Sequence, residues 1–212
     1  MKIVSINLGT RGTIKVGKSE TATGIDKAAV ESTVQISEVG LEGDYIADLE
    51  RHGGRDQAVY LYSMEDYTWW SVELDQELAP GMFGENITLS TFEADELRIG
   101  DRFKIGEVIL EVTFGRVPCA TFGAWMNDPT FVKRFVTANR PGVYTRVISE
   151  GTIQLNNTVE LIPTAADAPT VGELFELFHT REKDVDLMRS ALNFPIAERA
   201  VSAFKFWLDE VE

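Results

Sequence analysis

The sequence predicts a mainly β fold, a β-barrel with a few packed helices, followed by a small C-terminal element of three helices. Short apolar segments separated by Gly, Pro and Asn turn signals fill most of residues 1–162. After residue 170, apolar residues recur at helical spacing, and the intervening residues 163–169 have the composition of a linker. We therefore expect a barrel domain over residues 1–165 and a three-helix domain over residues 166–212.

Apolar or alternating character marks the expected strands, which cover residues 1–8, 57–62, 86–89, 107–114, 144–148 and 151–161. The clearest is 107–114, where Val108, Leu110 and Val112 occupy alternate positions and predict a half-buried strand. Within 151–161, the pair Asn156-Asn157 predicts a hairpin turn. Many short strands with turns at this spacing are typical of a closed or nearly closed barrel.

Helices are expected at two places within the barrel and three times after it. Ser63 is a candidate N-cap for a helix that runs to about Leu78, where Pro80-Gly81 would stop it, and a second helix should lie near 129–138. Amphipathic patterns over 171–178, 185–192 and 196–208 predict the three C-terminal helices. A three-helix segment of this length rarely folds alone. We therefore expect it to dock on the barrel or on another subunit.

Composition restricts the function. The 212 residues carry a formal net charge of −14 and one cysteine, and no apolar run approaches the length of a membrane helix. These features exclude a disulfide framework and argue against membrane or general nucleic-acid binding, and the expected location is the cytoplasm. The charge is uneven, however, because residues 98–146 hold eight basic and four acidic side chains. Residues 65–97 hold nine acidic side chains and no Lys or Arg, so of these two windows only 98–146 suits an anionic ligand.

Cys119 lies inside that basic window, just past the strand expected over 107–114. The nearby Arg116 favours the thiolate, the form that attacks electrophiles or binds soft metals. A small buried apolar residue is the other interpretation of a lone cysteine, and the residues alone leave both open.

A second candidate is the loop before the strand expected over 57–62, which reads Arg51, His52, Gly53, Gly54, Arg55 and Asp56. Paired glycines can turn successive N–H groups toward an anion, and arginines add bidentate phosphate donors. An ordinary glycine turn with solvated charges is the alternative. His52 is also the one histidine placed to act as a base for Cys119.

Two further loops carry polar side chains into strands. The loop 80–86 ends at Asn86, whose amide could bond to the edge of a heterocycle, although a plain loop is the alternative. The turn at 140–146 places Tyr144 and Arg146 at the start of a strand. Phosphate-binding, dinucleotide-binding, zinc-protease and serine-hydrolase motifs are absent from the sequence.

Taken in order, these motifs resemble the MOSC domain, the C-terminal domain of molybdenum cofactor sulfurases. The resemblance rests on His52-Gly53-Gly54, Phe83-Gly84-Glu85-Asn86, Leu97-Arg98-Ile99-Gly100-Asp101, Arg116-x-Pro118-Cys119 and Gly142-x-Tyr144-x-Arg146-Val147. The tail from about Thr170 resembles the three-helix segment of YiiM-type bacterial proteins. Gly115 and Gln57 depart from the family pattern, where proline and a basic residue are common.

This resemblance implies a MOSC-type barrel that binds the molybdenum cofactor, Mo-molybdopterin, with Cys119 as the metal ligand. It implies an oxidoreductase that reduces small N-hydroxylated compounds, such as hydroxylaminopurines and amidoximes, with His52 as proton donor or as a residue that orients the site. Candidates for pterin and phosphate contacts are Arg51, Gly53, Gly54, Arg55, Asn86, Arg116 and Arg146.

Other functions stay open at this point. Cys119 could carry a persulfide in cofactor or metal-cluster assembly, or the protein could carry the cofactor without catalysis. No flavin or haem motif is present, so a reductase would need a separate electron-donor protein, a flavin or iron–sulfur reductase. The acidic stretch 65–96 is either a docking face for that donor or a solvated surface. A homodimer is compatible with the sequence.

Overall fold

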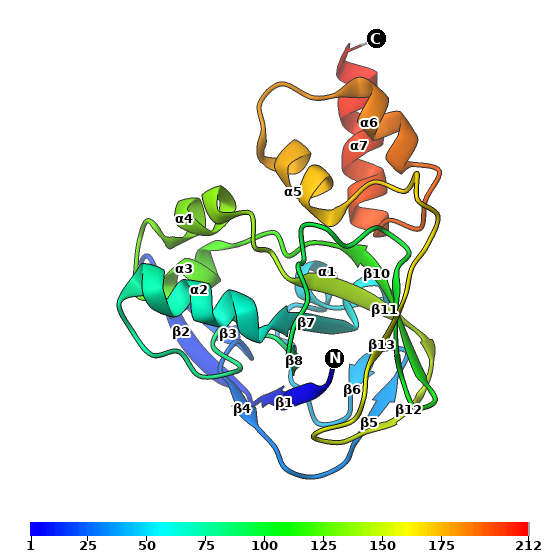
Figure 1. Ribbon diagram of the computed structural model, residues 1–212. Helices are drawn as coiled ribbons and strands as arrows, with labels where there is room; N and C mark the ends of the chain where they lie inside the picture. The colour runs from blue at the N-terminus through cyan, green and yellow to red at the C-terminus, as the bar shows by residue number, and fades with distance from the viewer. Residues whose placement is uncertain (212) are drawn as a thin grey trace.

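The structure, a computed structural model, describes residues 1–211 apart from the side chains of Glu50 and Arg51 (Figure 1). Its main sheet consists of β1 (Ile3–Gly9), β4 (Lys27–Ala29), β7 (Val59–Ser63), β8 (Ile87–Leu89), β9 (Arg102–Ile105), β10 (Val108–Phe114), β11 (Val143–Ser149) and β13 (Glu160–Ile162). The spatial order is β13-β9-β10-β11-β7-β8-β1-β4, and only β7 and β8 are parallel. The strands expected over 1–8, 57–62, 86–89, 107–114 and 144–148 are confirmed to within two residues.

This sheet is not closed into a barrel, so the predicted barrel is not confirmed. Within residues 1–211, β13 pairs with β9 alone and β4 pairs with β1 alone. The nearest approach to closure is an isolated bridge between Lys2 and Thr158, beside which the N–H of Val159 donates to the carbonyl of Met1 at 2.9 Å. A single bridge is not a ladder, and the sheet is curled but open.

Two small sheets complete the β structure. One has the order β12-β5-β6, built from Gly151–Ile153, Val34–Ser37 and Gly40–Leu41, and the other pairs β2 (Gly12–Val16) with β3 (Ser19–Thr23). The hairpin predicted over 151–161 is therefore wrong, because β12 pairs with β5 and β13 pairs with β9. The turn is present at Asn156, but its N–H donates to the carbonyl of Ile3 at 3.0 Å. Pairing with β1 separates the two arms.

Strand β10 is buried on both faces, which corrects the predicted half-buried strand. Glu111 is 6% exposed and Thr113 is fully buried. Glu111 accepts a hydrogen bond from Arg102 at 2.7 Å, and the hydroxyl of Thr113 donates to the carbonyl of Asp56 at 2.6 Å. Each polar group on the second face thus has a partner, as burial requires.

The helical elements are α1 (Leu49–His52), the 3₁₀ turn η1 (Arg55–Gln57), α2 (Met64–Leu74), α3 (Ala120–Trp125), α4 (Phe131–Ala138), α5 (Val171–His179), α6 (Val185–Ala191) and α7 (Glu198–Val211). The predicted helix near 129–138 and the three C-terminal helices are confirmed. Helix α2 ends four residues before the predicted Leu78, because Asp75 takes a left-handed conformation with φ 49°. No helix within residues 1–211 has the length and apolar character needed to cross a membrane.

Ser63 caps α2 as expected and also holds a neighbouring loop. Its fully buried hydroxyl accepts hydrogen bonds from the N–H groups of Glu65, at 3.1 Å, and Phe92, at 3.3 Å. We expect Ser63→Ala to lower the free energy of unfolding by about 1–2 kcal/mol, because a cap is lost and two donors lose their acceptor. Urea unfolding measures the change, with Ser71→Ala in the same helix as control. A loss in Ser71→Ala as large as that in Ser63→Ala would contradict the cap.

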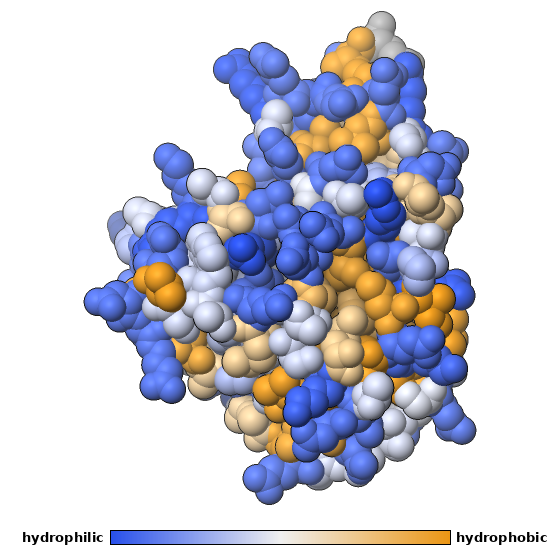
Figure 2. Space-filling model, in the orientation of Figure 1, coloured by the Kyte–Doolittle hydropathy of each residue, from blue (hydrophilic) through white to orange (hydrophobic). Residues whose placement is uncertain are grey.

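The C-terminal helices pack on the end of the sheet, above it in Figure 1. Val171 and Leu174 of α5 and Phe204 of α7 share one apolar core with Ile99 and Phe114 of the sheet region. The Phe114 ring lies 6.5 Å from that of Phe204. In the same orientation, Figure 2 shows mainly hydrophilic side chains over α2 and α4, and more apolar surface on the side of β11–β13. The three helices are therefore docked through the core of the sheet region.

A separate aromatic cluster supports the loop 80–86. The Phe83 ring is fully buried and lies 4.6 Å from Tyr62, 5.1 Å from Tyr67 and 5.8 Å from Trp70. This packing fixes the loop that carries Asn86, so that polar side chains on it have defined positions.

Candidate functional site

Cys119 lies at the side of a cavity between the sheet and the helices. The loop after β10 ends at Cys119, which is the residue before α3, and its side chain is half-buried. The cavity has a volume of about 400 Å³ and is lined by the β3 end, the turn at 44–48, the loops 84–86 and 116–121, and single residues from other elements. A thiol at a helix start beside a cavity is available for chemistry, as the position past β10 predicts.

The surroundings of Cys119 favour its thiolate. Burial raises the pKa of the thiol, but a hydrogen bond with His52 and the positive charge of Arg116 outweigh it and lower the pKa from 9.0 to about 6. His52 comes from α1 and lines the same cavity. The structure thus brings together Cys119, His52 and Arg116, three of the residues that the sequence singled out.

Arg116 is a buried cation in the cavity wall. Its side chain is 6% exposed and donates to the carbonyl of Phe83, and its guanidinium lies 4.1 Å from the Phe122 ring and 5.3 Å from the Tyr60 ring. Close packing continues at Gly84, whose φ is +73° and where a Cβ would lie 3.2 Å from the Arg116 guanidinium. Aromatic rings and one carbonyl hold the cation in place, and the cavity face of the guanidinium suits an anion.

Asn86 is held at the cavity by both ends of its amide. Its Oδ1 accepts from the N–H of Tyr60 at 3.1 Å and its Nδ2 donates to Asp44 at 2.8 Å. Asp44 also accepts from the N–H of Gly9 at 2.6 Å and pairs with Lys27 at 2.5 Å. Asn86 therefore belongs to a fixed polar wall, and of the two hydrogen bonds that an amide nitrogen can donate, the contacts of the described residues account for one.

Glu85 anchors the loop 80–86 to the interior of the protein. One carboxylate oxygen of this fully buried residue accepts hydrogen bonds at 2.7 Å from the hydroxyls of Tyr67 and Thr88 and from the N–H of Gly81. Burial raises its pKa. Each residue of the motif Phe83-Gly84-Glu85-Asn86 thus has its own role. The carbonyl of Phe83 accepts from Arg116, and Gly84 lets the backbone pass close to the guanidinium. Glu85 anchors the loop in the interior, and Asn86 lines the cavity.

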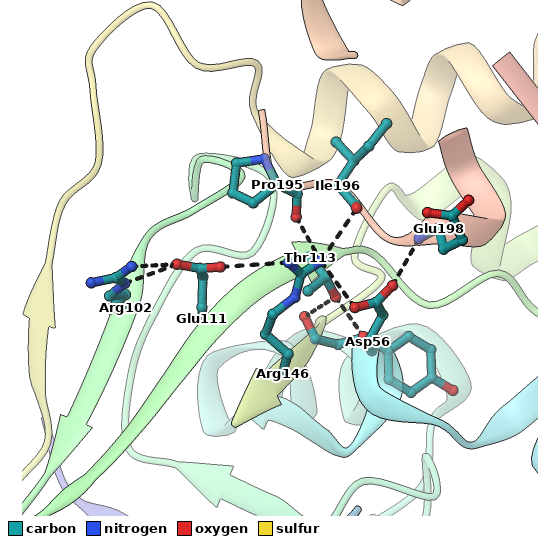
Figure 3. A network of polar contacts seen from close by, with 9 residues as sticks. Asp56, Arg102, Glu111, Thr113, Arg146, Pro195, Ile196 and Glu198 are labelled. Carbon is teal, nitrogen blue, oxygen red and sulfur yellow. Dashed lines mark hydrogen bonds and ion pairs between the residues drawn. The ribbon is translucent and has the colours of Figure 1, made fainter. Parts of the chain in front are cut away.

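Other residues that the sequence singled out do not line this cavity. Arg146 bonds to the carbonyls of Pro195, at 3.0 Å, and Ile196, at 3.3 Å, and pairs with Asp56 at 2.9 Å (Figure 3). It therefore connects the sheet to the C-terminal segment.

The glycine loop is placed beside the cavity rather than in its wall. Gly53 is buried against Leu49, where a Cβ would lie 3.1 Å from the Leu49 Cα, Gly54 has φ 85° before η1, and Arg55 is exposed. None of the three lines the cavity, although His52 next to them does. The side chain of Arg51 lies outside the described residues.

Sequence reasoning missed several residues of the cavity wall. Lys27 and Asp44 come from segments without a motif. The pairing of β4 with β1 places Lys27 opposite Gly9, and hydrogen bonds between Gly9 and the turn at Asp44 and Tyr45 bring Asp44 to Lys27 and Asn86. Arg199 comes from α7, far along the chain, and nothing in its local pattern connects it with Cys119. Tyr144 belongs to a motif that the sequence did show, and it lines the cavity one residue into β11.

The lowered pKa predicts the pH dependence of thiol reactivity. We expect iodoacetamide to alkylate cofactor-free protein with a midpoint near pH 6, since the thiolate present above that pH is the attacking form. His52→Leu should move the midpoint toward the value of about 8.5 for free cysteine. Loss of the single thiol per chain measures the rate, and His179→Leu serves as control. A wild-type midpoint at about 8 or above would contradict the described electrostatics.

The metal-ligating side chains at the cavity fit a metal ion whose other ligands come from a cofactor and not from the protein. Within the described residues, no three His, Cys, Asp or Glu side chains are grouped to hold a metal ion. The cavity offers one soft ligand, the Cys119 thiolate, beside the cationic Arg116. A molybdenum ion that carries sulfur ligands from an anionic pterin matches this set, because the protein need supply only one thiolate and a basic wall.

Comparison with known proteins agrees with this architecture. The family model described as "MOSC domain" matches residues 48–160. The uncharacterized protein YflK of Bacillus subtilis is 32% identical over 160 residues, which cover 76% of this chain and 72% of YflK. A protein named "Reductase" from Gibberella moniliformis is 28% identical over 193 residues, 88% of this chain and 34% of that longer protein.

A solved structure matches almost the whole chain. The crystal structure of YiiM from Geobacillus stearothermophilus superimposes with a TM-score of 0.81 over 98% of each chain, at 24% identity. That match extends through the C-terminal helices and shows that the fold is YiiM-like. The family model spans 113 residues, from the residue before α1 to the first residue of β13, which is more than half of the chain, and this chain therefore belongs to the MOSC domain family.

Proposed function

We propose that this protein is a molybdenum-cofactor-dependent reductase of small N-hydroxylated compounds, with Cys119 as the metal ligand. The observation that carries the proposal is a thiol with a pKa of about 6 at the wall of a 400 Å³ cavity, beside the buried cation Arg116. Membership of a family associated with the molybdenum cofactor, and a relative named as a reductase, support it.

In this proposal each wall residue has a stated task. The Cys119 thiolate supplies the single protein ligand, and Arg116 faces the negative charge of the pterin and its phosphate. Asn86 offers its remaining amide hydrogen, fixed by Tyr60 and Asp44. Gly53, Gly54, Arg55 and Arg146 act only indirectly, since they lie outside the cavity wall.

The reaction consumes two electrons and two protons. The N–O bond of the N–OH group breaks, an N–H bond forms, and the oxygen leaves as water. When bound, the cofactor supplies the two-electron redox chemistry. The electrons come from a separate donor protein, because the chain carries no flavin or haem motif. The hydrogen bond between His52 and the Cys119 sulfur holds the thiolate in its orientation, and in this proposal the His52 ring is the proton donor at the cavity.

Turnover with an artificial reductant tests the proposal. Protein made in a host that synthesises the cofactor is incubated with benzamidoxime and reduced methyl viologen, and benzamidine is measured. Product formation at many turnovers per chain is the expected result. Bound molybdenum without turnover would instead identify a cofactor carrier.

A sulfur carrier is the second candidate, because the same reactive thiolate would accept a persulfide. Incubation with a cysteine desulfurase and its substrate should then add about 32 Da to the intact mass, the mass of one sulfur. The reductase proposal predicts no such stoichiometric adduct on Cys119 when the cofactor is bound, because the sulfur is occupied.

A further inference from the structure

The segment 48–57 carries His52 to the cavity with little apolar packing of its own. Leu49 is 66% exposed, and Gly53, which is buried, packs against Leu49 of the same segment. On the side of the C-terminal helices, His52 faces Ala200 of α7 across a space of about 30 Å³. Apolar contacts therefore contribute little to the position of His52, and polar contacts have to hold the segment.

Asp56, four residues after His52, connects this segment to three other elements (Figure 3). Its Oδ2 accepts a hydrogen bond from the N–H of Glu198, the first residue of α7, at 2.8 Å. Its Oδ1 pairs with Arg146 of β11 at 2.9 Å, and its carbonyl accepts from the hydroxyl of Thr113 of β10 at 2.6 Å. Both carboxylate oxygens and the backbone of Asp56 are therefore bonded to different parts of the molecule.

The carboxylate of Asp56 caps α7 from a distant part of the chain. The first N–H groups of a helix have no acceptor within the helix, and Ala197, the residue before α7, has no polar side chain to supply one. Asp56 supplies that acceptor to Glu198, and its negative charge lies at the end of the helix dipole that favours it. The same bond therefore stabilises the start of α7 and the segment that carries His52.

Arg146 connects the same carboxylate to the residues just before α7. While it pairs with Asp56, it donates to the carbonyls of Pro195, at 3.0 Å, and Ile196, at 3.3 Å (Figure 3). The side chains of Arg146 and Asp56 are only 18% and 21% exposed, so solvent screens this pair less than it screens a surface pair. A displacement of α7 from the sheet would therefore break bonds to Asp56.

We infer that Asp56 is a positioning residue, through which the docking of α7 holds His52 in its hydrogen bond with Cys119. Asp56 is not among the residues that line the cavity, so it acts on the site through the segment that it anchors. The coupling is reciprocal, because a bond between two elements stabilises each of them by holding the other. This role goes beyond the proposed reductase function and does not depend on it, because the contacts belong to the chain itself.

Hydrogen exchange of the cofactor-free protein, followed by NMR, tests this role. One reporter is the main-chain N–H of His52, which donates to the carbonyl of Asp48 at 2.9 Å. The other is the ring N–H signal of His52, whose ring is hydrogen-bonded to Cys119. The chain has two histidines, so His179→Leu assigns this signal. The N–H of Val112 in β10 reports on global opening of the fold.

Glu198→Pro removes the N–H that donates to Asp56, and proline is well tolerated at the first residue of a helix. Glu198→Ala is the matched control, because it loses the same side chain and keeps the N–H. We expect both His52 protons to exchange at least about fivefold faster in Glu198→Pro than in Glu198→Ala, since a hydrogen bond to a charged group is lost and the segment opens more often. The Val112 rate should be alike in the two variants.

Equal exchange of the His52 protons in Glu198→Pro and Glu198→Ala would overturn the role of Asp56. An equal rise at Val112 would also overturn it, because the bond would then serve the stability of the whole fold and not the position of His52.

Asp56→Asn is an independent check. Asparagine has one acceptor oxygen for the two donors that Asp56 binds, so the His52 protons should again exchange faster than in wild type. Asp186→Asn, at an exposed position of α6, is its control and should match wild type. Wild-type exchange in Asp56→Asn would contradict the role. None of these measurements needs turnover, so a failed reductase assay would leave their outcome unchanged.

Discussion

Cys119→Ser is expected to lower the turnover of N-hydroxylated substrates by at least about 100-fold. Even residues that only orient metal ligands cost ten- to a hundredfold when replaced, and Cys119 is the ligand itself in the proposed function. Serine keeps the size of the side chain, but its hydroxyl stays protonated at neutral pH and is a poor ligand for a soft metal. The rate of benzamidine formation with reduced methyl viologen measures the effect.

Thr121→Ser is the matched control, because Thr121 lines the same cavity and the change removes only a methyl group. Its turnover should stay within about twofold of wild type, since small losses of packing have small effects away from the reacting atoms. More than half of the wild-type rate in Cys119→Ser would exclude the thiolate as an essential ligand.

The second large effect is on stability. Lys27→Met should lower the free energy of unfolding by about 3–5 kcal/mol, the usual cost of removing one partner of a buried ion pair. Lys27 and Asp44 pair at 2.5 Å with side chains only 7% and 5% exposed. Without Lys27, the carboxylate of Asp44 keeps the N–H of Gly9 and the amide of Asn86 but loses its counter-charge.

Chemical denaturation with Lys15→Met, an exposed lysine of β2, as control checks this result. The double variant Lys27→Met/Asp44→Asn should recover part of the loss, because no uncompensated charge is then buried. A loss in Lys27→Met no larger than that in Lys15→Met would show that the buried pair contributes nothing to stability.

Local patterns were sufficient to predict most elements. Alternation identified β10, a serine identified the start of α2, and helical spacing identified α5 to α7. What the patterns left out was long-range pairing. Asn156 does form a turn, but the contact with Ile3 that separates its two arms comes from the far end of the chain. Likewise, the alternation in β10 could not show that Arg102 and Asp56 would cover its polar face.

The candidate site likewise contains residues that local motifs predict and residues that only long-range contacts bring to it. Cys119, His52, Arg116 and Asn86 belong to local motifs and meet at one cavity. Arg146 carries an equally suggestive motif, yet its partners are carbonyls some fifty residues later, so its place is set by the docking of α7. Lys27, Asp44 and Arg199 have no motif at all, because tertiary contacts alone bring them to the cavity.

Molybdenum content measures the central claim directly. Wild-type protein and Cys119→Ser, both purified without reductant or chelator from a host that makes the cofactor, are analysed by plasma mass spectrometry, with molybdopterin measured as its fluorescent oxidation product. We expect close to one molybdenum and one pterin per wild-type chain, and almost no molybdenum in Cys119→Ser. Equal molybdenum in the two proteins, or none in a wild-type protein that reduces its substrate, would contradict the role assigned to Cys119.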